Sequence, residues 1–312
     1  MLCQSKNQAN IAILGTGAIG QLLFHQLSQA NIRVLMLRKA NNEIRPNELN
    51  FSSINQINSD SYLTQKVKFA TSNNAISNFE HIELVIVCVK AYQVINALTP
   101  FMPLLPKNCH VLLLHNGIGS HSKITEILGQ RGLSLGTTSQ GALRISDWHV
   151  RQTGTGKTQI GHFAGSKLSS TLKQQLIKAI PNLVWQQNIM FSLWTKLAIN
   201  AAINPLTARY QCKNGELEDQ KFKPLIKNVT TELILVANAE NIDLTLGETL
   251  NQIYEVISLT FDNYSSMHQD IMNGRKTEID AINGYIVTQG KKHHIAVPTN
   301  EKLLYQIKAL SG

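Results

Sequence analysis

A cluster of three glycines between an apolar run and an amphipathic run constrains the fold of this chain more than any other feature. Residues 10–15 are mostly apolar, which predicts a buried strand, and residues 18–30 have the apolar spacing of a helix. Gly15, Gly17 and Gly20 fall in the turn that joins them and form the pattern GxGxxG. A glycine turn from a strand into a helix is typical of the first unit of a parallel, doubly wound α/β sheet.

Each glycine of this turn has a separate physical role. Gly15 permits the tight turn, Gly17 lets the backbone approach a pyrophosphate, and Gly20 allows close packing of the helix on the strand. The N-terminus of the helix then offers unpaired N–H groups and a positive dipole to the phosphates. The turn therefore predicts a dinucleotide site, whose cofactor-binding residues are Gly15, Thr16, Gly17, Ala18, Ile19 and Gly20.

The end of the second predicted strand distinguishes between the two nicotinamide dinucleotides. Residues 32–37 form this strand and Arg38 follows it, with no carboxylate before Glu43. An NAD site usually has an acidic residue here for the ribose 2′-hydroxyl, whereas a guanidinium suits a 2′-phosphate. Arg38 therefore indicates NADP (NADPH), with a solvated basic turn as the alternative. Lys90, which ends the apolar run 84–90, is a second candidate for the phosphate or the ribose.

Short apolar runs alternate with helical patterns through the first half of the chain, which predicts a parallel, doubly wound sheet. Further strands are predicted at 84–90, 110–116, 133–138 and 183–187, and further helices at 92–105 and 168–180. Alternating Gly and Thr residues at 148–162 predict an antiparallel hairpin. After about residue 187 the spacing is almost wholly helical. We therefore expect a Rossmann-type α/β domain at 1–187 and an all-helical domain at 188–312.

The composition and the charge pattern exclude several classes of protein. The formal net charge is +9, but the Lys and Arg residues are scattered without a run of five, so no nucleic-acid partner is expected. No apolar run reaches the ~18 residues of a membrane span, and residues 1–10 are polar, unlike a secretory signal. The four cysteines form no CxxC pair and are interpreted as free thiols, which favours the cytoplasm. His293 and His294 lack matching ligands, so no metal site is expected.

The predicted helix that opens the second domain carries an unusual polar stripe. Lys196, Asn200 and Asn204 are spaced four residues apart and share one face, while the other positions are nearly all apolar. A solvent-facing stripe is the simpler interpretation, but Asn is a mediocre residue inside a helix. We therefore favour an internal polar cleft. A Lys ammonium there can stabilise and protonate the oxygen of a ketone that receives hydride, and Asn can orient the substrate without adding charge.

For three further polar residues, the sequence alone leaves both a structural and a functional interpretation open. Asn214 lies in an Asn-Gly-Glu turn and can serve turn formation alone. Ser266 and Glu278 lie in polar segments that helix caps and helix surface explain at least as well as a binding site.

Several motifs together resemble those of the ketopantoate reductase family. They are LGTGAIG at 14–20, VKAYQ at 89–93, HNGIG at 115–119, LWTKLAINAAINPLTA at 193–208, CKNGEL at 212–217 and SSMHQDIMNGRKTEIDAING at 265–284. The resemblance runs from the glycine turn to Pro298, nearly the whole chain, and departs in the first ten residues and at 139–141. It implies a Rossmann domain and a helical domain, with the active site in the cleft between them.

The resemblance also implies roles for single residues. Lys196 matches the family's proton donor, and Asn116 matches the position beside the nicotinamide and the substrate. Glu278 matches a cofactor-side position and is also a candidate catalytic partner of Lys196 or of the substrate. The remaining matches are substrate contacts at Asn200, Asn204, Asn214 and Ser266 and cofactor contacts at Arg38, Lys90 and Ala142.

These matches imply the NADPH-dependent reduction of 2-dehydropantoate (ketopantoate) to (R)-pantoate, a step of pantothenate and coenzyme A biosynthesis. A reductase of another branched 2-keto acid on the same scaffold is the nearest alternative. A non-catalytic NADP-sensing regulator is the second alternative, although a sensor would not need Lys196 and its Asn face. The expected partner is the small-molecule substrate, and the chain is expected to act as a monomer or a homodimer.

Overall fold

The structure is a computed structural model that describes residues 10–38, 47–54, 61–74 and 78–310. The chain divides into two compact units. The first unit holds Met1–His115 and His121–Ile189, and the second holds Asn116–Ser120 and Met190–Gly312. A five-residue piece from the first half of the sequence therefore packs as part of the second unit.

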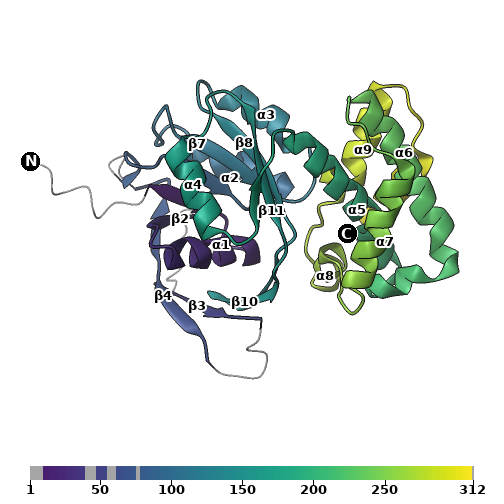
Figure 1. Cartoon of the computed structure of the whole chain (residues 1–312), viewed down its shortest axis with the longest axis horizontal. Coiled ribbons are helices and arrows are strands. Elements are labelled where there is room, and N and C mark those ends of the chain that lie inside the picture. The colour runs from purple at the N-terminus through teal and green to yellow at the C-terminus, as the bar shows by residue number, and fades with distance from the viewer. Residues whose placement is uncertain (1–9, 39–46, 55–60, 75–77, 311–312) are drawn as a thin grey trace, which may run out of the picture. The chain divides into compact units, whose positions relative to one another are not determined.

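An eight-stranded sheet with the order β12-β11-β8-β7-β6-β1-β2-β5 forms the centre of the first unit (Figure 1). Its strands are β1 (Ile11–Leu14), β2 (Val34–Arg38), β5 (Lys68–Thr71), β6 (Leu84–Val87), β7 (His110–Leu114), β8 (Leu133–Thr138), β11 (Thr158–Ala164) and β12 (Leu183–Trp185). All neighbouring pairs are parallel except β8 and β11. Every residue of β1, β6 and β7 is buried, which explains their almost continuous apolar sequences.

The helices in this part of the chain are α1 (Ala18–Gln29), α2 (Val94–Leu98), α3 (Ser120–Ile127) and α4 (Ser170–Ala179), with 3₁₀ turns η3 (Ala91–Gln93) and η4 (Thr99–Phe101). The predicted helix at 92–105 is therefore shorter than expected and passes into 3₁₀ turns. Pro100 lies at the start of η4, where its missing N–H group and fixed φ favour a new turn over a continued α-helix.

The predicted antiparallel hairpin at 148–162 is wrong. Its two halves lie in different sheets: β10 (His149–Gly154) belongs to a separate four-stranded sheet, whereas β11 pairs with β8. The small sheet has the order β4-β3-β10-β9, with β3 (Glu48–Ser52), β4 (Leu63–Lys66) and β9 (Gly141–Ser146). Gly156, between β10 and β11, packs so closely on Ser139 that an added Cβ atom would collide with its carbonyl oxygen. The Gly-Thr pattern correctly indicated two strands, but packing against distant segments determines which strands they pair with.

Helix α1 lies between the two sheets (Figure 1). His25 on α1 stacks on Phe51 of β3, with ring centroids 3.6 Å apart and planes within 8° of parallel. On the same helix, Gln26 Nε2 donates to Gln140 Oε1 at 2.6 Å, and Gln140 Nε2 donates to Thr158 Oγ1 at 3.0 Å. The helix that follows the glycine turn is therefore fixed from both sides.

The second unit is helical, and the predicted fold class is confirmed. Its elements are α5 (Ile189–Tyr210), η5 (Asn214–Glu218), η6 (Gln220–Phe222), α6 (Lys223–Ala239), α7 (Leu246–Leu259), α8 (Ser266–Met272), η7 (Ile279–Ala281), α9 (Asn283–Lys292) and α10 (Pro298–Leu310). Among the described residues, no helix has both the length and the apolarity that a membrane span requires.

Candidate active site

The three glycines between β1 and α1 differ in what surrounds them. Gly15 has φ +125°, and a Cβ atom there would lie 2.8 Å from the carbonyl carbon of Cys88. A Cβ atom on Gly20 would collide with the carbonyl oxygen of Gly15. No described atom lies within 4 Å of a Cβ atom placed on Gly17. Packing within the protein therefore requires Gly15 and Gly20, whereas Gly17 faces open space that a pyrophosphate can occupy.

The residues between these glycines leave the start of α1 open to an anion. The carbonyl oxygen of Thr16 accepts a hydrogen bond from Gln21 Nε2 at 2.8 Å, which holds the turn against the helix. Ala18 and Ile19 form the first turn of α1, which contains no acidic residue and no capping side chain. The N–H groups of this turn are thus available to phosphate oxygens.

Arg38, the last residue of β2, has a guanidinium group that suits a phosphate. The guanidinium carbon lies 5.0 Å from the centre of the Phe69 ring, so the ring holds the group from one side. Its Nε and Nη1 atoms are buried and have no hydrogen-bond partner within the described part of the chain. Buried charged donors without partners are costly, and a bound anion would supply the missing acceptors.

Lys90 lies three residues beyond β6 and precedes η3, so the predicted strand ends earlier than expected. Strands β6, β1 and β2 are neighbours and run parallel. Lys90, the glycine turn and Arg38 follow these three strands, so they meet at the same carboxyl edge of the sheet. That edge is where open α/β sheets bind ligands. Ala142 is placed differently, because it lies on β9 of the four-stranded sheet, opposite Gln152.

Lys196, Asn200 and Asn204 lie on α5, at the helical spacing that the sequence predicts. Lys196 and Asn200 are half-buried, and Asn204 is only 7% exposed. The stripe is therefore an interior polar face and not a solvated surface.

Lys196 has an acidic partner within the same unit. Burial lowers the pKa of Lys196 to about 8, and the nearby charge of Glu278 opposes this shift by raising the pKa. Glu278 precedes η7 and is only 5% exposed. A buried carboxylate thus keeps an ammonium charged near neutral pH while leaving its proton easy to transfer.

Asn116 meets the same carboxylate. Its Nδ2 atom donates to Glu278 Oε2 at 3.3 Å. The segment around it is fixed by a hydrogen bond of 3.0 Å from the Ile118 N–H to the Ala281 carbonyl oxygen. Gly117 has φ +79°, and a Cβ atom there would collide with that same oxygen. The HNGIG segment therefore packs against η7, and this contact brings Asn116 to Glu278.

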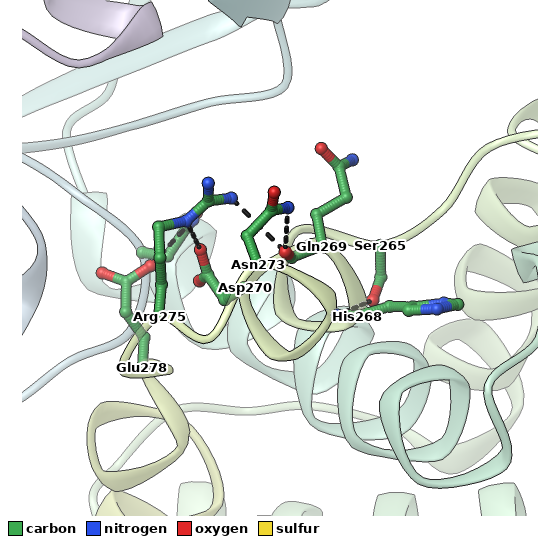
Figure 2. Close-up of polar contacts among 8 residues, drawn as sticks. Ser265, His268, Gln269, Asp270, Asn273, Arg275 and Glu278 are labelled. Carbon is green, nitrogen blue, oxygen red and sulfur yellow. Dashed lines mark hydrogen bonds and ion pairs between the residues drawn. The ribbon is translucent and has the colours of Figure 1, made fainter. Parts of the chain in front are cut away.

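The loop before Glu278 is held by an ion pair that the sequence analysis did not identify. Arg275 Nε lies 3.1 Å from Asp270 Oδ1, and the Arg275 N–H donates to the Asp270 carbonyl oxygen at 2.8 Å. Figure 2 shows this pair beside Glu278, between α8 and the following turn. The Asp270 side chain is almost fully buried, so the loop that carries Glu278 has a fixed starting point.

Asn214 and Ser266 are also both in the second unit. Asn214 Nδ2 donates to Thr260 Oγ1 at 2.9 Å, while its buried Oδ1 has no partner among the described residues. Ser266 is the first residue of α8, directly after the capping residue Ser265. A substrate hydroxyl would satisfy the Asn214 oxygen, because that atom can only accept.

Asn283 is a second residue that sequence reasoning missed, and Pro205 is the signal that could have found it. Pro205 lies inside α5 and has no N–H group for the carbonyl oxygen of Ala201. Asn283 Nδ2 donates to that oxygen at 3.3 Å and to Asn300 Oδ1 at 3.0 Å. Asn283 therefore restores the bond that the proline removes, one residue beyond Asn200.

Two family models match nearly the whole chain. The model described as "Ketopantoate reductase PanE/ApbA" matches residues 11–165, and the model described as "Ketopantoate reductase PanE/ApbA C terminal" matches residues 188–311. A 2-dehydropantoate 2-reductase of Vibrio cholerae is 37% identical over 303 residues, which cover 96% of this chain and 97% of that protein.

Two solved structures are similar over the same extent. The ternary structure of D-mandelate dehydrogenase with NADH and anilino(oxo)acetate has a TM-score of 0.85 at 25% identity and covers 96% of this chain and 97% of its own. The PanE/ApbA family ketopantoate reductase from Ralstonia eutropha has a TM-score of 0.83 at 25% identity, with 96% and 98% covered. Both similarities thus extend over nearly the whole of each chain.

Proposed function

The chain belongs to the ketopantoate reductase family, and we propose from this premise that it catalyses the NADPH-dependent reduction of 2-dehydropantoate to (R)-pantoate, with Lys196 as the proton donor. The observation that carries the assignment of Lys196 is its place on the polar face of α5, where burial lowers its pKa and the charge of the buried Glu278 opposes that shift. NADPH, when bound, supplies the hydride. The task of the chain's own residues is to orient the keto acid and to stabilise and protonate its oxygen.

Lys196 is suited to that task by its environment. Burial makes the ammonium less stable than in water, so it gives up its proton more readily. The charge of Glu278 keeps enough of the ammonium form present at neutral pH. Glu278 also accepts the hydrogen bond from Asn116, and this directs the Asn116 side chain toward the same region.

The keto acid is bound mainly by neutral groups. Asn200 and Asn204 line the face of α5 that carries Lys196, and Asn214 has a buried acceptor atom without a partner among the described residues. Ser266 supplies a hydroxyl at the start of α8. Neutral donors and acceptors can orient the substrate without competing for the developing charge on its oxygen.

The first unit supplies the groups that suit the pyrophosphate and the 2′-phosphate of the cofactor. The open space at Gly17 and the uncapped start of α1 suit the pyrophosphate, and the guanidinium of Arg38 suits the 2′-phosphate of NADPH. Lys90 reaches the same sheet edge, and Ala142 on β9 adds an apolar contact. Asn116 and Glu278 are the proposed contacts on the nicotinamide side.

A second candidate is the reduction of another 2-keto acid. The similarity to D-mandelate dehydrogenase favours it, because that protein has the same fold and its structure contains NADH and anilino(oxo)acetate. A purified preparation should therefore be supplied with NADPH and, in parallel, 2-dehydropantoate, phenylglyoxylate and other branched 2-keto acids. The highest kcat/KM on 2-dehydropantoate supports the first function, and a clearly higher value on another acid replaces it with the second.

The compartment and the assembly belong to the same proposal. Cys88, Cys109 and Cys212 are all free thiols, which is typical of the cytoplasm, and we place the chain there. The substrate is the partner that the site requires, and the chain acts as a monomer or a homodimer. Analytical ultracentrifugation would distinguish these two states.

A further inference from the structure

Two buried hydroxyl groups join α5 to the residue that caps α8 in the second unit. Thr207 Oγ1 on α5 and Ser265 Oγ before α8 lie 2.7 Å apart, although 58 residues separate them in the sequence. Thr207 is 0% exposed and Ser265 is buried as well. Both groups are shielded from water, so losing the hydrogen bond between them would lower the free energy of unfolding.

Each hydroxyl is also bonded to the main chain of its own segment. Thr207 Oγ1 lies 2.9 Å from the carbonyl oxygen of Ile203 and 3.1 Å from that of Asn204. Ser265 Oγ accepts the N–H of His268 at 3.1 Å and so caps α8 (Figure 2). The pair therefore connects the backbone at Ile203 and Asn204 with the backbone at the start of α8 through two side chains.

His268 extends this connection to a third segment. Its Nδ1 atom lies 3.2 Å from the carbonyl oxygen of Cys212, and because a carbonyl oxygen can only accept, Nδ1 carries the proton. The His268 ring is buried and meets the Tyr264 ring edge-on at 4.8 Å. Cys212 precedes Asn214 by two residues, so α8 is also tied to the Asn214 turn.

We propose that Thr207 and Ser265 are positioning residues that hold Asn204 and Ser266 at the separation the substrate requires. The inference rests on the proposed function, in which Asn204 and Ser266 both contact the keto acid. Thr207 Oγ1 contacts the carbonyl oxygens of Ile203 and Asn204, and Ser265 is the neighbour of Ser266. The hydroxyl pair therefore fixes the distance between the backbone that carries Asn204 and the backbone that carries Ser266. Lys196 lies about three turns before Thr207 on α5, so the chemical step depends less on the pair.

The test is a comparison of Thr207→Val with a matched control, Thr230→Val. Thr230 lies on α6, is 0% exposed, and donates at 2.7 Å to the Ile226 carbonyl oxygen of its own helix. Both changes remove one buried hydroxyl at nearly constant shape. We expect Thr207→Val to raise the KM for 2-dehydropantoate about 3- to 10-fold, with a much smaller fall in kcat and unchanged NADPH affinity. Thr207→Ser should restore most of the KM.

Two results would overturn the proposal. One is an unchanged KM in Thr207→Val, and the other is an equal rise in Thr230→Val, which would indicate a general loss of packing.

A second measurement separates this inference from the proposed function. Amide hydrogen exchange at residues 265–268 should be faster in Thr207→Val than in Thr230→Val, whatever the substrate is. If the wild type reduces another keto acid, the KM of that acid is the quantity to compare. If it reduces none, the proposed function fails, and equal exchange in the two variants would still overturn the proposed link between α5 and α8.

Discussion

The side chain of Asn116 donates to the carboxylate of Glu278 at 3.3 Å, although 162 residues separate the two in the sequence. The same carboxylate raises the pKa of Lys196 against the effect of burial. One buried carboxylate therefore accepts a hydrogen bond from the Asn116 amide and also stabilises the charged form of Lys196. Changes at Glu278 should consequently alter both the protonation of Lys196 and the orientation of Asn116, whereas changes at Lys196 should remove the group that stabilises and protonates the substrate oxygen.

Replacing Lys196 with Ala should lower kcat by at least about 100-fold, because general acid catalysis typically contributes about 10²–10⁴-fold. NADPH should still bind, since the glycine turn lies in the other unit. Stopped-flow turnover and fluorescence titration of NADPH measure the two effects. Lys223→Ala, at an exposed residue of α6, is the control. Near-normal turnover in Lys196→Ala would end its assignment as proton donor.

The dependence of kcat on pH should show the coupling between Lys196 and Glu278. In the wild type, kcat should fall as pH rises through about 8, because the ammonium form is lost. Glu278→Gln removes the charge that raises the pKa of Lys196, so the fall should move to lower pH. A pH–rate profile of both proteins measures the direction of the change. A fall that stays in place or moves upward would contradict the coupling.

The same variant tests whether Glu278 distinguishes between substrates. Ketopantoate has a terminal hydroxyl that 2-oxo-3,3-dimethylbutanoate lacks, and a site built for a hydroxyl can reject the deoxy analogue by as much as about 10⁴–10⁵-fold. We expect Glu278→Gln to reduce this preference, mainly by loss of kcat/KM on ketopantoate. Equal losses on both substrates together with weaker NADPH binding would assign Glu278 to the cofactor, and unchanged values would remove it from the site.

Arg38→Ala should weaken NADPH binding and leave NADH binding almost unchanged. A charge-assisted hydrogen bond to the 2′-phosphate contributes about 1.5–3 kcal/mol, or roughly 10–150-fold in affinity. Isothermal titration with both dinucleotides measures the difference. Arg33→Ala provides a matched control, because Arg33 is an exposed arginine just before the same strand. A wild-type protein that prefers NADH would overturn the choice of cofactor.

His110 should make the first unit sensitive to acid. Burial, with a smaller effect of His162, lowers the pKa of His110 to about 4, and the residue is 3% exposed. A folded-state pKa below the unfolded value gives stability that is present above pH ~6.5 and is lost as pH falls toward 4. Acidification from pH 7 to pH 5 should thus cost about 2 kcal/mol of unfolding free energy from this group.

Urea unfolding at several pH values measures this loss. His110→Gln should be less stable at neutral pH, because it gives up the bond to Ser134, yet should lose less on acidification. Equal pH dependence in the two proteins would contradict the assignment to His110.

Local patterns predicted the parts of the site that adjoin a single strand or helix. The glycine turn, Arg38 and Lys90 follow three parallel strands, and parallel strands place their carboxyl ends at one edge. Lys196 and its Asn face required only the period of one helix. These placements are visible in a single sequence because the residues involved are close along it.

Contacts between distant segments could not be predicted in this way. Strands β3 and β4 were missed, because β4 pairs with β3 and β3 pairs in turn with β10, about a hundred residues later. No local pattern links Thr207 to Ser265 or Asn116 to Glu278, because each pair is made by packing of whole elements. The family motifs contain all four residues, but a motif does not state which of its members touch.

The contact between Asn283 and the Ala201 carbonyl has a consequence for the order in which the second unit is completed during synthesis. Pro205 leaves that carbonyl without its usual partner, and the replacement lies on α9, itself bonded to Asn300 of α10. When only α5 has emerged from the ribosome, the carbonyl oxygen of Ala201 in this helix therefore still lacks its hydrogen-bond donor. The helix that carries Lys196 reaches its final hydrogen bonding only after Asn283, about seventy residues beyond the end of α5, has emerged.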